Sequence, residues 1–273
     1  EYLARTRNFS GTLHLIFQPA EELLYGGRVM VEEGLFEQFP CDHIFGLHNM
    51  PSQPLGKIGL RDGAMMASSD TVHIEVNGVG GHGAVPEHTV DATLVACHIT
   101  LALQSIVSRN ITPFQPVVVT VGSIQAGHAP NIINDKVLMK LTVRTLDEAV
   151  RQTVLQRIHD IAVAQAESFN ATATIRHVNG SPVLSNNPQA NEMVRTVATD
   201  LFGQDAVASV NAFMGSEDFA FMLEKNPHGC YFTLGAGDEP DRCMVHNPGY
   251  DFNDKLLLTG AALWTALTEH YLR

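Results

Sequence analysis

Residues Gly11–Glu22 read GTLHLIFQPAEE, a short apolar run followed by a proline and two adjacent carboxylates. Leu13–Phe17 has the length of a buried strand, and Pro19 would end its hydrogen-bonded ladder. Glu21 and Glu22 must point in different directions, so one could bind a metal ion while the other moves a proton. The alternative is a solvated acidic pair at the start of a helix, where carboxylates suit the positive end of the helix dipole.

The composition favours a small-molecule partner. A chain of 273 residues with 45% hydrophobic residues can form two domains with sizeable cores. The net charge of -12 argues against nucleic acid or an anionic membrane as the partner. No apolar run approaches a membrane span in length, and no signal peptide is recognisable. Four cysteines without paired spacing indicate reduced thiols and a cytoplasmic location; they are Cys41, Cys97, Cys230 and Cys243.

The first 67 residues alternate strand and helix. Leu24–Glu33 has helical spacing and stops at Gly34. A second apolar run, His43–His48, predicts a strand that ends at His48. Residues 53–67 are rich in Gly and Pro and predict loop and irregular strand, leading to a domain boundary near Ser68.

The middle of the chain has a different order of elements. The predicted series is strand Thr71–Asn77, helix Thr89–Ser108, strand Pro116–Gly122, strand Val137–Arg144, helix Leu146–Ser168 and strand Ala171–Val178. This β-α-β-β-α-β order predicts a ferredoxin-like domain, with two helices on one face of a four-stranded antiparallel sheet. Because one edge strand stays open to pair with another copy, we expect a homodimer through this domain.

The last third returns to alternating strand and helix. The predicted elements are helix Asn187–Leu201, strand Val207–Asn211, helix Ser216–Leu223, strand Cys230–Leu234, a glycine-rich loop Gly235–Asp241 and helix Asp254–Tyr271. The economical architecture is one α/β domain, residues 1–67 and 180–273, interrupted by an inserted domain of residues 68–179.

Three of the thirteen histidines stand out by position. His48 ends a predicted strand, His246 precedes Asn-Pro-Gly in a loop, and His82 lies among small residues that would expose its ring. Zinc-type hydrolase sites take imidazole and carboxylate ligands from strand ends and loops, and Glu22, His48 and His246 fit that description. The alternative, three unrelated surface residues, is not excluded by spacing alone.

The chain resembles the metal-dependent aminoacylase and carboxypeptidase family over essentially its whole length. The motifs that carry the resemblance, in order, are FQPAEE, GLHNMP, GGHGAVPEHTVDA, APNIIND, VRTLDE, FMGSEDF and VHNPGYDFND. They are most similar to the amidohydrolase branch, which includes hippurate hydrolases and auxin-conjugate hydrolases. The resemblance implies an α/β zinc-peptidase-like catalytic domain with a mixed sheet, interrupted by a ferredoxin-like lid.

The resemblance also implies roles for individual residues. Glu21 would be the general base that activates the attacking water and then protonates the leaving amine, and Glu22, His48 and His246 would be metal ligands. His82 would donate to the oxyanion, from the same or the partner subunit. Asn131 and Arg144 would hold the free carboxylate of an N-acyl amino acid. The loop with Gly215 and Ser216 would line the substrate pocket. For Arg144 the alternative is a solvated residue at a strand end.

One departure from the family limits this interpretation. Family members carry a Cys-Gly-His-Asp stretch upstream of the glutamate pair, which completes a site for two divalent ions such as Zn, Mn, Co or Ni. None of the four cysteines has that context, so we expect the chain to lack the N-terminal part and to be inactive by itself. The alternatives are a dipeptidase or carboxypeptidase of the same family, and a non-catalytic dimerisation or ligand-binding module.

Overall fold

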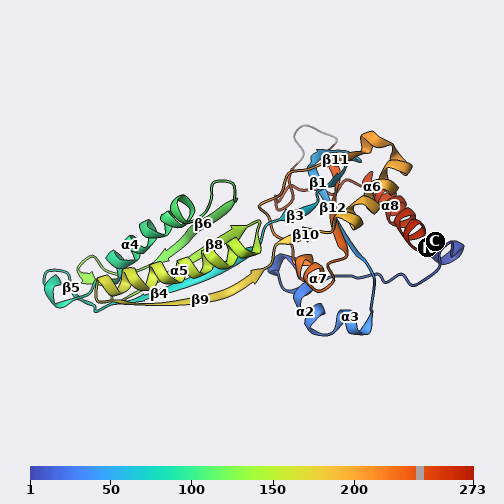
Figure 1. Ribbon diagram of the computed structural model, residues 1–273. Coiled ribbons are helices and arrows are strands. Elements are labelled where there is room, and N and C mark those ends of the chain that lie inside the picture. Colours follow the sequence, from blue (N-terminus) through green and yellow to red (C-terminus); the bar gives the residue numbers. More distant parts are fainter. Residues whose placement is uncertain (238–242) are drawn as a thin grey trace. The chain divides into compact units, whose positions relative to one another are not determined.

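The computed structural model describes residues 1–237 and 243–273, and it forms two compact units (Figure 1). Unit 1 comprises Glu1–Met65, Leu184–Ala212 and Asp218–Arg273. Unit 2 comprises Met66–Val183 and Phe213–Glu217. Part of the predicted glycine-rich loop, residues 238–242, lies outside the described residues.

Unit 1 is built on a mixed four-stranded sheet, which confirms the predicted α/β class. Its strand order is β1 (Ile44–Pro54), β12 (Gly229–Gly237), β2 (Ile58–Leu60) and β11 (Val207–Ser209). β1 runs parallel to β12, β12 antiparallel to β2, and β2 parallel to β11. Eight of the nine residues of β12 are buried, as expected for a strand covered on both faces. A second small sheet pairs β3 (Gly63–Met66) with β10 (Leu184–Asn186).

The helices of unit 1 are α1 (Tyr2–Thr6), η1 (Glu21–Leu23), α2 (Gly26–Glu32), α3 (Leu35–Gln38), α6 (Pro188–Phe202), η4 (Gln204–Ala206), α7 (Phe219–Lys225) and α8 (Leu256–Tyr271). Asn187 begins α6 because its side-chain oxygen accepts hydrogen bonds from two backbone amides of the first turn. Val194 on α6 and Leu263 on α8 pack with Phe232 of β12, so these two helices and the sheet share one core.

Unit 2 is an antiparallel sheet with two helices. The strands are β4 (Ser69–Asn77), β6 (Val117–Gln125), β8 (Lys136–Thr145) and β9 (Thr172–Ser181), in the order β6-β8-β4-β9. The helices are α4 (Ala92–Ser105), continued by the π-helical turn η3 (Ile106–Asn110), and α5 (Glu148–Ser168). A small ribbon pairs β5 (Gly81–His82) with β7 (Ile132–Ile133), next to the turn η2 (Pro86–His88). The sequence analysis did not predict this ribbon.

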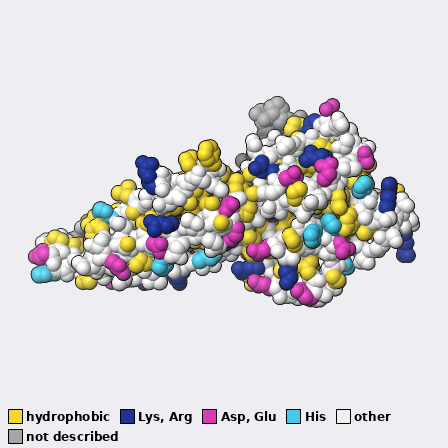
Figure 2. Space-filling view, in the orientation of Figure 1, with side chains coloured by type: hydrophobic (Ala, Val, Ile, Leu, Met, Phe, Trp, Pro, Cys, Tyr) yellow, Lys and Arg dark blue, Asp and Glu magenta, His cyan; other side chains and the backbone are white. Residues whose placement is uncertain are grey.

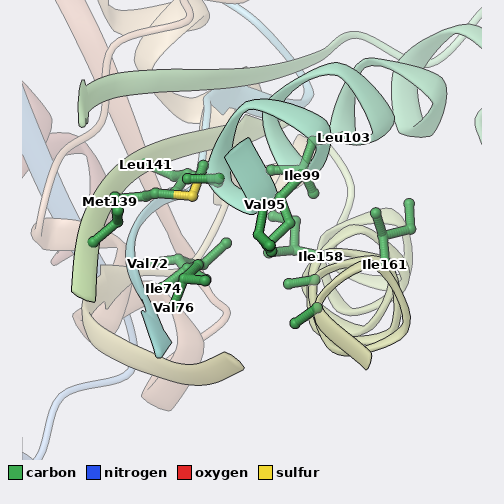
Figure 3. Packing of buried hydrophobic residues seen from close by; sticks show 14 of the residues in the cluster. Val72, Ile74, Val76, Val95, Ile99, Leu103, Met139, Leu141, Ile158 and Ile161 are labelled. Atoms are coloured by element: carbon green, nitrogen blue, oxygen red, sulfur yellow. The ribbon is translucent and has the colours of Figure 1, made fainter. Parts of the chain in front are cut away.

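The core of unit 2 lies between the sheet and the two helices (Figure 3). Strand β8 alternates buried and half-buried residues, and its buried side chains Met139 and Leu141 face Val95 and Ile99 of α4. The helical stretch Ala92–Asn110 is long and apolar enough to cross a membrane by length and composition alone. About a third of this stretch is buried, so the core of unit 2 accounts for only part of its apolar character.

A buried ion pair joins β4 to α5 inside unit 2. The Arg151 guanidinium donates two hydrogen bonds of 2.8 Å to the fully buried Asp70 carboxylate. His177 Nε2 lies 2.7 Å from the same carboxylate, and Glu148 accepts from Arg151 at 3.0 Å. These carboxylates raise the pKa of Arg151 above its usual value in spite of its burial.

Replacing Arg151 by Met should lower the free energy of unfolding by about 3–5 kcal/mol, because the Asp70 carboxylate would stay buried without its guanidinium partner. Denaturant unfolding followed by circular dichroism measures the change. Arg157→Met is the matched control, since Arg157 and its partner Asp160 are both exposed and such pairs contribute about 1 kcal/mol or less. Equal losses in the two variants would contradict the prediction.

The strand predicted at Leu13–Phe17 is wrong for this structure. Residues 12–20 belong to no strand or helix of the described chain, and Leu15 and Phe17 are exposed instead of buried. A strand requires a neighbour for its backbone groups, and the unit 1 sheet ends at β1. The prediction that His48 ends its strand is also wrong, because β1 continues to Pro54.

Candidate metal centre

The adjacent carboxylates Glu21 and Glu22 lie on the short 3₁₀ turn η1. Both flanking residues, Ala20 (φ 52°) and Leu24 (φ 50°), have left-handed backbone conformations that are uncommon for residues other than glycine. Successive side chains of a 3₁₀ helix are about 120° apart, so the two carboxylates diverge. The backbone strain at this turn is of the kind that accumulates at functional sites.

Glu22 meets His246, which lies 224 positions later in the sequence. Its Oε2 is 3.5 Å from His246 Nδ1, and both side chains are exposed. His246 also has a left-handed backbone, with φ 66°. A carboxylate oxygen and an imidazole nitrogen in this arrangement are ligands that Zn²⁺ and related ions accept. The structure thus brings two of the three predicted metal ligands together.

His48 lies on β1 in a fixed tautomer. Its Nδ1 is 2.6 Å from the backbone carbonyl of Asn49; because a carbonyl can only accept, Nδ1 carries the proton. The lone pair of Nε2 is then available to a metal ion, and such a carbonyl partner is common for ligating histidines. The Asn49 side chain donates to the Tyr250 hydroxyl, which joins β1 to the loop that carries His246.

Glu21 approaches Asp218, a residue that the sequence analysis did not assign. Oxygen atoms of the two carboxylates lie within 4.8 Å of one another. Asp218 is fully buried and accepts a 2.6 Å hydrogen bond from the Gly27 amide and another from the Gln18 side chain. Two carboxylates this close together favour a cation beside them. The signal in the sequence is the acidic pair Glu217-Asp218, which directly follows the Gly215-Ser216 loop assigned to pocket lining.

Gly26 and Gly27, the first two residues of α2, let this helix start in close contact with the backbone of Pro19 and Asp218. A Cβ on Gly26 would lie 1.5 Å from the Pro19 carbonyl oxygen, and one on Gly27 would lie 2.6 Å from the Asp218 carbonyl oxygen. Side chains are therefore excluded at both positions, because backbone atoms cannot move aside as a flexible side chain can.

Gly27→Ala should lower the free energy of unfolding by about 1–3 kcal/mol and displace Asp218, because the new methyl group overlaps the Asp218 backbone. Thermal unfolding of the purified chain measures this loss. Gly122→Ala is the control: it lies in β6, and its new Cβ would meet nothing closer than 3.9 Å. If the Gly27 variant is as stable as the Gly122 variant, α2 moves to accommodate the new methyl group and the prediction is wrong.

His82 and Asn131 lie together in unit 2, on the β5/β7 ribbon. The Gly83 amide donates to the Asn131 carbonyl at 2.8 Å, and His82 pairs with Ile132. The Ala84 amide donates to His82 Nδ1 at 3.1 Å, which places the proton of the neutral ring on Nε2. His82 is exposed, so this N–H is presented to solvent as a hydrogen-bond donor.

Arg144 lies near the far end of β8, in the four-stranded sheet of unit 2. The ribbon precedes Lys136, the first residue of β8, whereas Arg144 is close to the last. Eight residues of strand at about 3.3 Å each separate these ends by about 26 Å. Arg144 Nη1 is buried and has no hydrogen-bond partner among the described residues. Burial lowers the pKa of Arg144, and the charge of Asp70 opposes this shift. The guanidinium is therefore a desolvated cation that still has an unused hydrogen-bond donor.

Gly215 and Ser216 lie in the loop before α7, which begins at Phe219 instead of the predicted Ser216. The Gly215 carbonyl accepts a 2.9 Å hydrogen bond from the Ala67 amide. Gly215 is exposed and Ser216 half-buried, so both remain accessible to a ligand.

The chain is similar to known proteins over nearly its whole length. The sequence model of Peptidase family M20/M25/M40 matches residues 1–270. Hippurate hydrolase of Campylobacter jejuni is 42% identical over 274 residues, covering 100% of this chain and 70% of that protein.

Two solved structures are also similar. A putative aminohydrolase from methicillin-resistant Staphylococcus aureus has a TM-score of 0.91 and 29% identity, covering 99% of this chain and 70% of that one. A dinuclear metal-binding M20 peptidase of Bacillus subtilis has a TM-score of 0.82 and 28% identity, covering 99% of this chain and 68% of that one. The chain spans about two thirds of the length of such relatives, and 62% of a hydrolase from Sinorhizobium fredii.

Proposed function

Because the chain belongs to Peptidase family M20/M25/M40, a family of metal-dependent hydrolases, we propose that it supplies the catalytic base of an amidohydrolase that cleaves N-acyl amino acids. The products are a carboxylic acid and a free amino acid. The observation that carries this proposal is the contact between Glu22 and His246, with Glu21 on the same turn.

The residues of unit 1 have distinct roles in this proposal. Glu22, His48 and His246 would hold a divalent ion, which would supply water activation near neutral pH and polarise the amide carbonyl. Glu21 points away from Glu22; it takes the proton of the attacking water and later gives it to the leaving amine. The complete site holds two ions of the Zn, Mn, Co or Ni type. Three protein ligands are too few for two ions, so the 273-residue chain alone is expected to bind metal weakly and to be inactive.

The positions of Arg144, His82 and Asn131 in unit 2 lead us to propose a homodimer. Unit 2 acts as the ferredoxin-like lid, with His82 as oxyanion donor, Asn131 and Arg144 as carboxylate ligands, and Gly215 with Ser216 as pocket lining. About 26 Å separates Arg144 from the ribbon of His82 and Asn131, so one chain cannot place all three on one small substrate. A site that uses them all combines Arg144 of one chain with His82 and Asn131 of the partner subunit, paired through the lid sheet.

The experiment is an amide hydrolysis assay on the protein made from the complete reading frame, with added Zn²⁺, Mn²⁺, Co²⁺ or Ni²⁺. We expect release of glycine from hippurate and of amino acids from their N-acetyl derivatives, with stoichiometric metal. Activity confined to dipeptides would instead favour the dipeptidase or carboxypeptidase alternative. Absence of both activity and metal would favour the non-catalytic module. A small-molecule substrate agrees with the negative net charge, and we propose a cytoplasmic location because the four cysteines are free.

A further inference from the structure

Unit 1 contains a cavity of about 320 Å³ between the helices α2 and α7, which pack against one another (Figure 1). This volume lies at the lower end of the range for small-molecule sites, which is about 300–1,000 Å³. The lining residues have no role in the candidate metal centre. They are two basic, two acidic and two apolar side chains, namely Arg28, Lys225, Glu32, Glu224, Val31 and Phe221.

The two helices that line the cavity both start at Asp218. The Gly27 amide in the first turn of α2 donates a 2.6 Å hydrogen bond to the Asp218 carboxylate, and α7 begins at Phe219, the next residue in the chain. Asp218 is fully buried. A single buried residue thus fixes the starts of both helices, and the cavity does not need a ligand in order to form.

Arg28 lines this cavity with a hydrogen-bond donor that is not used. Its Nε is buried and has no hydrogen-bond partner in the part of the chain that the structure describes. Glu32 Oε1 is 3.7 Å away, which is too far for a hydrogen bond. The guanidinium also lies over the Tyr25 ring, 5.1 Å from its centroid. Because the Arg28 side chain is 35% exposed, it can turn and give this donor to a ligand oxygen.

The charges around the cavity restrict the class of ligand. Glu32 and Glu224 would repel a simple anion, and Arg28 and Lys225 would repel a simple cation. A zwitterion satisfies both signs of charge at once. Lys225 already pairs with Glu37 at 3.4 Å, so Arg28 is the better partner for a ligand carboxylate.

Mixed charge by itself is ordinary on this protein. On the face of unit 1 that Figure 2 displays, acidic, basic and hydrophobic side chains lie close together. The cavity is distinguished by the unused donor of Arg28 and by the half-buried apolar side chains Val31 and Phe221, which line it together with the charges. A ligand that uses all of these features has a carboxylate, an ammonium group and an apolar body.

We infer that the cavity between α2 and α7 binds a free α-amino acid with an apolar side chain, such as leucine. The carboxylate of the ligand pairs with Arg28, and its ammonium group pairs with Glu32 and Glu224. Its side chain packs on Val31 and Phe221. The inference does not depend on the proposed activity, because no residue of this cavity belongs to the candidate metal centre.

The test is a calorimetric titration of leucine into the protein made from the complete reading frame. Arg28→Met should weaken binding about tenfold to a hundredfold, because it removes a charge-assisted, hydrogen-bonded pair. Arg195→Met is the matched control and should bind leucine like the wild type. Arg195 is 37% exposed against 35% for Arg28, and each arginine pairs with a glutamate of its own helix that is 65% exposed.

Leucine held at the metal centre is affected by neither substitution, so the difference between the two variants measures the cavity alone. Both variants should melt close to the wild-type temperature, because the ion pairs that they lose are largely exposed. Equal leucine binding by the two variants overturns the inference, as does a wild-type protein that binds no leucine.

Three further probes test the class of ligand. Each lacks one feature of leucine: 4-methylpentanoate lacks the ammonium group, 3-methylbutylamine lacks the carboxylate, and glycine lacks the apolar side chain. Each should bind about tenfold more weakly than leucine or worse. Glu224→Gln should weaken leucine binding about tenfold and leave 4-methylpentanoate binding unchanged, which provides a test that does not require the Arg28 variant to fold. A probe that binds as tightly as leucine would overturn the assignment to an apolar amino acid.

Discussion

Replacing Glu21 by Gln is expected to lower kcat for hydrolysis of an N-acyl amino acid by about 10²–10⁴-fold in the protein made from the complete reading frame. The amide keeps the size of the side chain but cannot take a proton from water. Because Glu22 and His246 remain, the metal content should stay at the wild-type value. KM should also change little, since the lost interaction belongs to the transition state. Steady-state kinetics and metal analysis of the same preparation provide both readouts.

The matched control is Glu33→Gln, which removes an exposed carboxylate just after α2 and should leave kcat unchanged. Glu22→Gln provides the contrast, because it should lower the metal content together with the activity. A Glu21→Gln variant that keeps its kcat would remove Glu21 as the base. A loss of metal from that variant would reassign Glu21 as a ligand.

Co-expressing Glu21→Gln with His82→Ala should restore about a quarter of the wild-type activity, although each variant alone is nearly inactive. If the oxyanion donor is His82 of the partner subunit, a mixed dimer contains one site with both residues intact. Half of randomly formed dimers are mixed, and each has one intact site of two. Removal of an oxyanion donor costs about 10²–10³ in kcat, so the recovery stands well above the background.

The matched control pairs Glu21→Gln with His246→Ala. Glu21 and His246 both lie in unit 1, close to Glu22, so every site in a mixed dimer lacks one of them and no recovery is expected. If the pairing with His82→Ala recovers no more activity than this control, His82 serves its own chain. The separation of Arg144 from His82 would then require Arg144 to lie outside the site.

The sequence by itself determined the elements that depend on local pattern. In unit 2 the predicted strands and helices all form, because alternation in β8 and helical spacing in α4 are read from neighbouring residues. In unit 1 the predicted strands His43–His48 and Cys230–Leu234 became longer strands of one mixed sheet. The ordered motifs, from FQPAEE to VHNPGYDFND, were sufficient to identify the family.

Only the tertiary structure decided how distant residues meet. It brought Glu22 to His246, assigned the proton of His48 to Nδ1 and revealed Asp218 beside Glu21. It also separated Arg144 from His82 by most of the length of β8, which no spacing in the sequence indicates.

The stretch Leu13–Phe17 shows the physical reason for this division. Its pattern predicts a strand as a local preference, but these residues belong to no strand of the described chain. A strand forms only when another segment satisfies its backbone groups, and that partner is a property of the whole assembly. Local sequence therefore determines conformational preference, whereas pairing, burial and the geometry of the site depend on contacts between residues far apart in the chain.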